Sequence, residues 1–451
     1  MAQISIINLS KLGGASRLDA EYYKPEYLKI EDGIKENHLN FTTFEKLHLK
    51  VDASAFYPAL EPLYGSGNLP FLRVEDVDTT IHYDGAETIP EEILEKFKTL
   101  KVVKEGDLVI TKGGSVARVG LVTKKAAVCR DIIFINSSKL DRVDYTYLFF
   151  YFLTDFANKL LIRSSSLTAQ PHLTITLVRE IPIFNPKKQF KQEISDMYQS
   201  VTHEYEKSRQ FYQQAEQLLL DELEFNRLNL KHELVYTVNF SETLKHMRID
   251  AEYYLPHYKE ISKAIENYGS AKLQTIIQIK DNNFIPKTGH RYRYIELSNI
   301  SKEGFITDFT LEVGENLPSR ARRLVKTGDV IISSIEGSLS SCALITKEYD
   351  DSLCSTGFYV LRSAKINPET LLVMFKLKEY QELLKKGCSG TILTAINKDE
   401  LESIMVPIID KDIQDKIAAK VRDAHESRTK AKQLLEEAKR KVEKAIEEKV
   451  G

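Results

Sequence analysis

A long internal repeat is the feature that most limits how this chain can fold. The segment from Ile4 to Ile30, which contains RLDAEYYKPEYLKI, recurs from Val235 to Ile261 with RIDAEYYLPHYKEI, at a constant offset of 231 residues. Ten positions are identical without a gap: Asn8, Ser10, Arg17, Asp19, Ala20, Glu21, Tyr22, Tyr23, Pro25 and Tyr27 match Asn239, Ser241, Arg248, Asp250, Ala251, Glu252, Tyr253, Tyr254, Pro256 and Tyr258. A period this long is not that of a solenoid, so the chain is predicted to be two copies of one unit.

Weaker matches continue along both copies. The segment GDLVI at 106–110 matches GDVII at 328–332, and IPI at 181–183 matches VPI at 406–408. In each copy, short β-rich runs punctuated by Gly and Pro come first. A stretch without Gly or Pro in its interior follows, and its apolar residues step by three or four positions. This spacing predicts a long helix with a heptad-like apolar seam.

The two predicted helices need partners for their apolar seams. A helix of roughly 40 residues is about 60 Å long, which exceeds the core of a small domain. The two copies can supply the partners to each other, and an antiparallel pair is the simplest arrangement. The alternative is two unrelated surface helices, whose seams would then be exposed to water.

Composition narrows the class of protein. The chain has 451 residues, of which 42% are hydrophobic, and no apolar run approaches the ~18 residues of a membrane-spanning helix. The N-terminal MAQISIINLS has neither a basic leader with an apolar stretch nor an arginine-rich amphipathic pattern, so we expect a cytoplasmic protein. Four scattered cysteines disfavour a disulfide framework or a zinc ribbon. The formal net charge of -2 argues against a nucleic-acid binder unless basic residues are clustered on one surface.

The layout of the chain resembles that of the DNA specificity subunit of type I restriction-modification enzymes. The resemblance rests on the duplicated RLDAEYY and RIDAEYY segments, the GDLVI and GDVII strands, and the proline before each helix, Pro182 and Pro407. It implies an α+β fold with two similar α/β target-recognition domains, separated by two long antiparallel coiled-coil helices in a pseudo-twofold duplication. The expected ranges are 1–185 for the first target-recognition domain, 186–232 for the first spacer helix (conserved region 1), 233–409 for the second domain and 410–451 for the second spacer helix (conserved region 2).

The resemblance also implies a function and partners. Each domain would read one half of a split site in double-stranded DNA, and the helices would fix the spacer between the halves. The partners implied are two methyltransferase subunits that use S-adenosylmethionine and, in a restricting assembly, motor-nuclease subunits. The sequence lacks N-P-P-Y, F-x-G-x-G and G-x-x-x-x-G-K-[ST] motifs, so we expect a non-catalytic recognition subunit. The alternative is a protein-interaction scaffold with two binding domains on a coiled-coil rod.

Candidate DNA-contacting residues cluster before and after the GD strands. In the second copy they are Arg291, Tyr292, Arg293, Arg320, Arg322 and Arg323. Arginine can read guanine or bind phosphate, and tyrosine can stack or form hydrogen bonds. The alternative is a solvated face whose strand tyrosines pack inward.

The loop after the GD strand of the first copy holds the other candidates. They are Lys112, Ser115 and Arg118, in KGGSVAR. The equivalent loop of the second copy carries Glu336 and no basic residue, so the two loops cannot read the same base if both face DNA. The alternative is a plain glycine-shaped hairpin turn.

Two further patterns carry polar residues. The repeated Arg, Asp, Glu and Tyr positions look like a catalytic cluster, but their recurrence in two otherwise different domains favours a framework role or a surface for a common partner. The segments 164–172 and 387–391 precede the last strand of each globular part and suit either polar DNA contacts or a turn. His172, within the first, has no partner residue at an informative spacing and is expected to be packed or solvated.

Overall fold

The computed structural model describes residues 6–8, 12, 19–56, 59–83, 85–165, 172–228, 230, 235–301, 303–390 and 394–450. Arg17 and most of 164–172 lie outside them. The chain divides into two compact units: unit 1 is Met1–His203 with Lys430–Gly451, and unit 2 is Glu204–Thr429. No helix of the described part is long and apolar enough to cross a membrane.

Unit 1 contains two four-stranded sheets. One has the order β2-β9-β6-β7 and the other β4-β3-β8-β5, with a parallel pair between β3 and β8. Helix α3 is buried on nearly every side and packs against β7, because its sequence TYLFFYF is apolar all round. The elements are α1 (Pro25–Glu36), β1 (Phe41–Thr42), β2 (Val51–Ala53), β3 (Leu69–Leu72), β4 (Glu87–Ile89), α2 (Ile93–Lys96), β5 (Lys101–Val103), β6 (Leu108–Thr111), β7 (Val119–Leu121), β8 (Ala126–Val128), β9 (Ile132–Ile135), α3 (Arg142–Leu153), α4 (Asp155–Ser164), α5 (Ile175–Glu180) and β10 (Ile183–Phe184).

Unit 2 repeats this topology. Its sheets have the orders β12-β19-β16-β17 and β14-β13-β18-β15, again with one parallel pair, β13 with β18. The predicted duplication of an α+β unit is therefore confirmed. The elements are α7 (Phe240–His246), α8 (Pro256–Tyr268), β11 (Ser270–Lys272), α9 (Leu273–Ile276), β12 (Ile277–Lys280), β13 (Arg291–Ile295), β14 (Thr310–Val313), β15 (Ala321–Leu324), β16 (Val330–Ser333), β17 (Cys342–Leu344), β18 (Leu353–Ser355), β19 (Phe358–Ser363), α10 (Pro368–Lys376), α11 (Lys378–Lys386), β20 (Cys388–Ser389), β21 (Ala395–Ile396), α12 (Lys398–Ser403) and β22 (Met405–Pro407).

The repeated GD dipeptides close the same turn in both copies. Gly106 and Gly328 have φ of +87° and +85°, a conformation that glycine adopts without strain. Asp107 and Asp329 are buried, and each accepts a hydrogen bond at 2.8 Å from the backbone N–H three residues earlier. The dipeptide therefore starts the central strands β6 and β16 at a fixed place.

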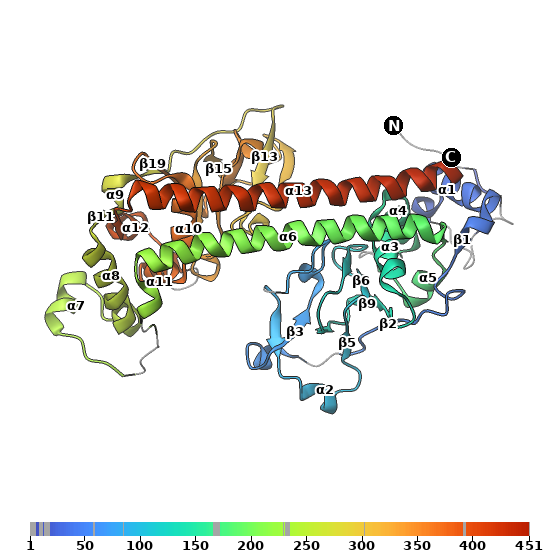
Figure 1. Ribbon diagram of the computed structural model, residues 1–451, viewed down its shortest axis with the longest axis horizontal. Coiled ribbons are helices and arrows are strands. Elements are labelled where there is room, and N and C mark those ends of the chain that lie inside the picture. Colours follow the sequence, from blue (N-terminus) through green and yellow to red (C-terminus); the bar gives the residue numbers. More distant parts are fainter. Residues whose placement is uncertain are drawn as a thin grey trace. The chain divides into compact units, whose positions relative to one another are not determined.

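The two long helices are α6 (Lys188–Glu222) and α13 (Lys411–Val450). In unit 2, Ser208 Oγ donates to Ala424 O at 2.7 Å, and Lys420 Nζ lies 5.2 Å from the centroid of the Phe211 ring. Because the contact moves towards the start of α13 as it moves along α6, the helices are antiparallel, as predicted (Figure 1).

The apolar seams of both helices are buried. The buried positions of the seams are Ile194, Val201, Tyr212, Ala215 and Leu219 in α6, and Ile417, Val421, Ala424, Ala431, Ala438, Val442 and Ile446 in α13. They step by three or four residues over much of each helix, as the sequence predicted. The alternative of two surface helices with exposed seams is therefore wrong.

Candidate nucleic-acid interface

The candidate loop of unit 1 follows β6 and is a tightly bonded turn. The Thr111 side chain donates to the Ser115 carbonyl and accepts a hydrogen bond from Arg118 N at 3.0 Å. Gly114, with φ of +67°, makes the bend. Ser115 and Arg118 are exposed and Lys112 is partly buried. The loop is thus a structured hairpin that presents two polar side chains to solvent.

The end of the second polar segment lies against this loop. Leu173 N donates to Lys112 O at 3.0 Å, so residues just before α5 are fixed to the loop after β6. His172 is exposed, and its Nδ1 lies beside the backbone at Gly113. Thr168 and Gln170 of this segment lie outside the described residues.

Unit 2 builds the same loop pair from different side chains. Ile396 N donates to Ser334 O at 2.9 Å, and Glu336 N donates to Thr394 O at 3.0 Å. The first of these bonds is the counterpart of the bond between Leu173 and Lys112 in unit 1. In each unit, the loop after the GD strand is therefore bonded to residues that follow the second polar segment, although 166–171 and 391–393 lie outside the described residues.

The arginines of β13 are exposed and its tyrosines are buried. Arg291 and Arg293 alternate with Tyr292 and Tyr294, as the two faces of a strand require. Tyr292 is 7% exposed, and its hydroxyl accepts a hydrogen bond from Lys287 N at 3.2 Å. Tyr292 therefore packs inward, which is the alternative left open for it, whereas the two arginines remain available at the surface.

The arginines around β15 lie in the same sheet. Arg320 is exposed, and Arg322 is half-buried, with its Nε donating to Ser319 O at 3.1 Å. A register shift between Ala321 and Arg323 marks a bulge, so Arg322 is left out of the pairing with β18.

The strand register places the side chains of Arg323 and the β13 arginines on one face. Arg323 and Ile295 both pair with Cys354 of the central strand β18. Because side chains two residues apart share a face, Arg291 and Arg293 lie on the Ile295 face. The sequence-predicted arginines at 291, 293 and 323 are therefore brought onto one sheet face.

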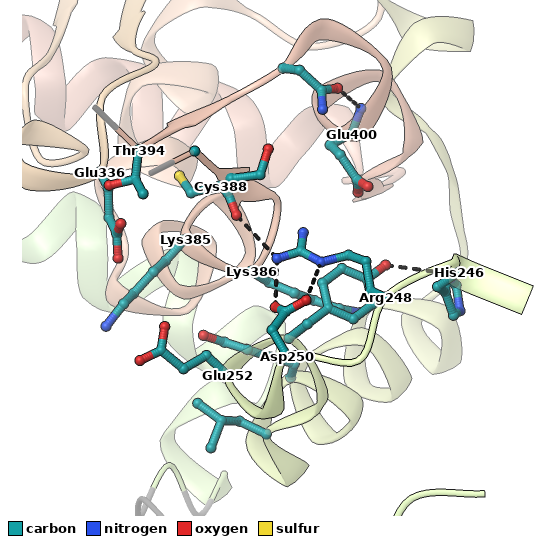
Figure 2. Close-up of a pocket in the computed structure, with 16 residues that line it drawn as sticks. His246, Arg248, Asp250, Glu252, Glu336, Lys385, Lys386, Cys388, Thr394 and Glu400 are labelled. Carbon is teal, nitrogen blue, oxygen red and sulfur yellow. Dashed lines mark hydrogen bonds and ion pairs between the residues drawn. The ribbon is translucent and has the colours of Figure 1, made fainter. Parts of the chain in front are cut away.

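The repeated RIDAEYY motif lines a pocket of about 580 Å³ in unit 2 (Figure 2). Arg248 donates to Asp250 through Nε at 2.9 Å and Nη2 at 2.6 Å, and Nη2 also lies 3.3 Å from Cys388 O. The guanidinium lies 4.3 Å from the centroid of the Tyr253 ring. The motif residues thus bond mainly to one another and to the backbone, which supports the framework interpretation.

The charges around this pocket are mixed. Arg248, Lys385 and Lys386 face Asp250, Glu252, Glu336 and Glu400, as the lining residues in Figure 2 illustrate. Burial raises the pKa of Tyr253 to about 12 and lowers the pKa of Lys386 from its ordinary value. Within the described residues, no group of three or more His, Cys, Asp or Glu side chains could hold a metal ion.

Comparison with known proteins assigns the family. The model of the type I restriction modification DNA specificity domain matches this chain twice, over residues 49–217 and 265–440. The chain belongs to this specificity family. The two matches fall one in each copy of the repeat, so each copy carries its own specificity domain.

A curated relative matches part of the chain at low identity. The type I restriction enzyme MjaIX specificity subunit of Methanocaldococcus jannaschii is 27% identical over 154 residues, which are 34% of this chain and 35% of that protein. The chain therefore matches about a third of the length of this relative.

Solved structures of the specificity family also align with the chain. An S subunit from M. genitalium aligns over 91% of this chain and 95% of its own, with 13% identity and a TM-score of 0.37. The HsdS subunit of Thermoanaerobacter tengcongensis aligns over 85% and 90%, with 15% identity and a TM-score of 0.26. The family assignment rests on the two matches to the family model of the specificity domain.

Proposed function

We propose that this chain is the non-catalytic, DNA-reading subunit of a type I restriction-modification complex, with one half-site read by each unit. The observation that carries the proposal is an equivalent backbone hydrogen bond that holds the loop after the GD strand in both units, from Leu173 N to Lys112 O and from Ile396 N to Ser334 O. The shared framework gives each unit a similar polar edge, and the side chains on that edge differ.

The difference in side chains supports an asymmetric target. The loop after β6 presents Arg118 and Ser115, whereas the equivalent loop of unit 2 carries Glu336. Arginine suits guanine or phosphate and glutamate suits the cytosine amino group, so the two edges favour different bases. The exposed Arg291 and Arg293 add positive charge to unit 2.

The helices are proposed to set the spacer between the half-sites. Helix α13 has 40 residues, which correspond to about 60 Å at 1.5 Å per residue. A paired helix is stiff, so it would tolerate one distance between two readers where a flexible tether would tolerate several.

The partners are proposed from the same family. Two methyltransferase subunits that use S-adenosylmethionine would dock around the paired helices, and motor-nuclease subunits would join them in a restricting assembly, in the cytoplasm. Such partners can supply phosphate contacts, which is compatible with a formal net charge of -2 in this chain.

Sequence selection tests the proposal. The full chain, mixed with its methyltransferase subunit, is used to enrich random duplexes in repeated gel-shift rounds. We expect two short, different motifs at one fixed separation. Enrichment of no split motif would favour the alternative of a protein-interaction scaffold.

A further inference from the structure

Each unit has one further polar side chain at the end of its parallel strand pair. The pairing of β3 with β8 ends at Leu72, and the pairing of β13 with β18 ends at Ile295. The residues that follow are Arg73 and Glu296. The register of the equivalent strands therefore places a cation in one unit where the other unit has a carboxylate.

The backbone around these two residues is the same. Arg73 has φ of -108° and ψ of 175°, and Glu296 has φ of -107° and ψ of 170°. Arg73 N donates to Asp76 Oδ2 at 2.7 Å, and Glu296 N donates to Asn299 Oδ1 at 2.8 Å. Each residue thus begins a short helical turn that a side chain three positions later closes. Because the turn is closed through the backbone N–H, the side chain at its start can differ between the two units.

In unit 1, this turn lies beside the loop after β6. A Cβ atom on Gly114 of that loop would lie 3.6 Å from Val74 Cγ1, so the residue next to Arg73 packs against the loop. Lys112 N donates to Asp131 O at 2.9 Å, which holds the turn between β8 and β9 to the same loop. One edge of unit 1 is thus formed by three segments, 73–76, 111–118 and 130–131.

Unit 2 builds the equivalent edge in the same way. A Cβ atom on Gly357 would lie 3.4 Å from Ile335 Cδ1 and 3.7 Å from Leu297 Cδ1. The residue after Glu296 therefore lies close to the loop after β16. Ser334 N donates to Gly357 O at 2.9 Å, which is the counterpart of the bond that holds the unit 1 loop. The three segments of this edge are 296–299, 333–338 and 356–357, and the structure describes every residue of both edges.

The two edges differ in charge. The unit 2 segments hold no basic residue and two acidic residues, Glu296 and Glu336. The unit 1 segments hold three acidic residues and four basic residues, which are Arg73, Lys112, Arg118 and Arg130. The exchange of Arg73 for Glu296 replaces a hydrogen-bond donor by an acceptor on the same backbone.

Both side chains can still bind a partner. The Arg73 side chain is 35% exposed, and its Nη2 lies 3.1 Å from Glu75 Oε1. A guanidinium has five N–H donors, so one surface ion pair leaves others for a base edge. Glu296 is exposed, and its carboxylate accepts from the backbone N–H of Asn299. This bond orients the carboxylate, which has further lone pairs for a second donor.

We infer that Arg73 and Glu296 are specificity-determining residues, each reading one base in the half-site of its own unit. The inference rests on the proposed function and deepens it, because it assigns a base to each residue. Arginine donates to O6 and N7 of guanine, and glutamate accepts from N4 of cytosine. The half-site of unit 1 therefore contains a guanine read by Arg73, and the half-site of unit 2 contains a cytosine read by Glu296.

Sequence selection with single variants of the full chain, mixed with its methyltransferase subunit, tests the inference. Glutamine suits adenine, because its amide pairs with N6 and N7 of that base. In Glu296→Gln we expect one position of one half-site to change from cytosine to adenine, with about a tenfold loss of affinity for the original site. Arg73→Gln should change one guanine of the other half-site to adenine in the same way. The remaining positions and the spacer should not change.

Glu348→Gln and Arg142→Gln are the matched controls. Each removes an exposed charge of the same sign from the same unit, near the GD turn at the other end of the central strand. Both controls should keep the original motif. An unchanged motif in Glu296→Gln or in Arg73→Gln, or an equal loss at every position of a half-site, would overturn the inference.

Two further measurements keep the test decisive. If a glutamine variant does not fold, Glu296→Met and Arg73→Met keep the length of the side chain, and each should lose the base preference at its position without gaining one for adenine. A retained preference in the methionine variant would overturn the inference. Absence of any split motif with the unaltered chain would instead refute the proposed function.

Discussion

Removal of the buried carboxylate of Asp329 should open unit 2 selectively. Asp329 has no exposed surface, and its side chain accepts from Lys280 Nζ at 2.8 and 2.9 Å and from Arg362 Nε at 2.6 Å. It also accepts from Lys326 N at 2.8 Å, which closes the turn before β16. Asp329→Ala leaves the turn amide and two cations without this partner.

The size of the effect follows from the exposure of the cations. Breaking a buried ion pair by deleting one partner costs about 3 to 5 kcal/mol. The side chains of Lys280 and Arg362 are 28% and 41% exposed, so water partly compensates them. We therefore expect the lower end, about 3 kcal/mol, which raises the open population of unit 2 on the order of 100-fold.

Cysteine labelling under native conditions measures this population. Cys342 and Cys354 are fully buried in unit 2, and burial raises the pKa of Cys342 to about 12. Because the thiolate is the reactive form, labelling requires opening, and its rate follows the open population when reclosing is faster than labelling. Cys129 of unit 1 is only partly buried, so it serves as the internal control for the labelling reagent, and its labelling rate is expected to be unaffected.

Asp351→Asn is the matched control. Asp351 is an exposed carboxylate of unit 2 that pairs with the Lys326 side chain, and such surface pairs contribute about 0 to 1 kcal/mol. In this variant, the labelling rate of Cys342 and Cys354 should rise less than about fivefold. A similar small rise in Asp329→Ala, or an equal rise at Cys129, would refute the reasoning.

Three further predictions concern recognition and pH. Arg291→Ala and Arg293→Ala should each weaken DNA binding at one half-site by about tenfold or more. Binding is measured on duplexes that are altered in one half-site. An equal loss of affinity at both half-sites would place these arginines on a surface that both half-sites share. Lys112→Ala should affect only the other half-site in the same assay. Burial, with Arg428 adding, lowers the pKa of His425 from 6.5 to about 4, so the folded state binds fewer protons than the unfolded state between these values. The contribution of neutral His425 to the free energy of unfolding is therefore complete above pH 6.5 and is lost as pH falls towards 4, by up to about 3 kcal/mol. His425→Gln should lack this pH dependence when chemical denaturation is compared at pH 7 and pH 4.5. An unchanged pH dependence in this variant would contradict the role given to His425.

The sequence predicted the duplication and the paired helices because both depend on patterns that are visible along the chain. Ten identities at one offset required two copies of one unit. The seam from Ile194 to Leu219 follows helical spacing, and its burial needed only a partner of the same kind. The alternation of Arg291, Tyr292 and Arg293 also has the period of a strand and could have placed the tyrosine inside.

The contacts that connect distant segments could not be predicted in this way. The carboxylate of Asp329 is bound by Lys280, 49 residues away, and Arg163 reaches the carbonyl of Tyr22, 141 residues away. No local pattern marks either pair.

The most direct measurement of the central claim is methylome sequencing of cells that carry the chain with one heptad inserted into both α6 and α13. Seven residues add about 10 Å and rotate a helix by only about 20°, so the pairing of the two helices is retained. The account predicts the same two half-sites with a longer spacer. New half-sites with the original spacer would contradict it.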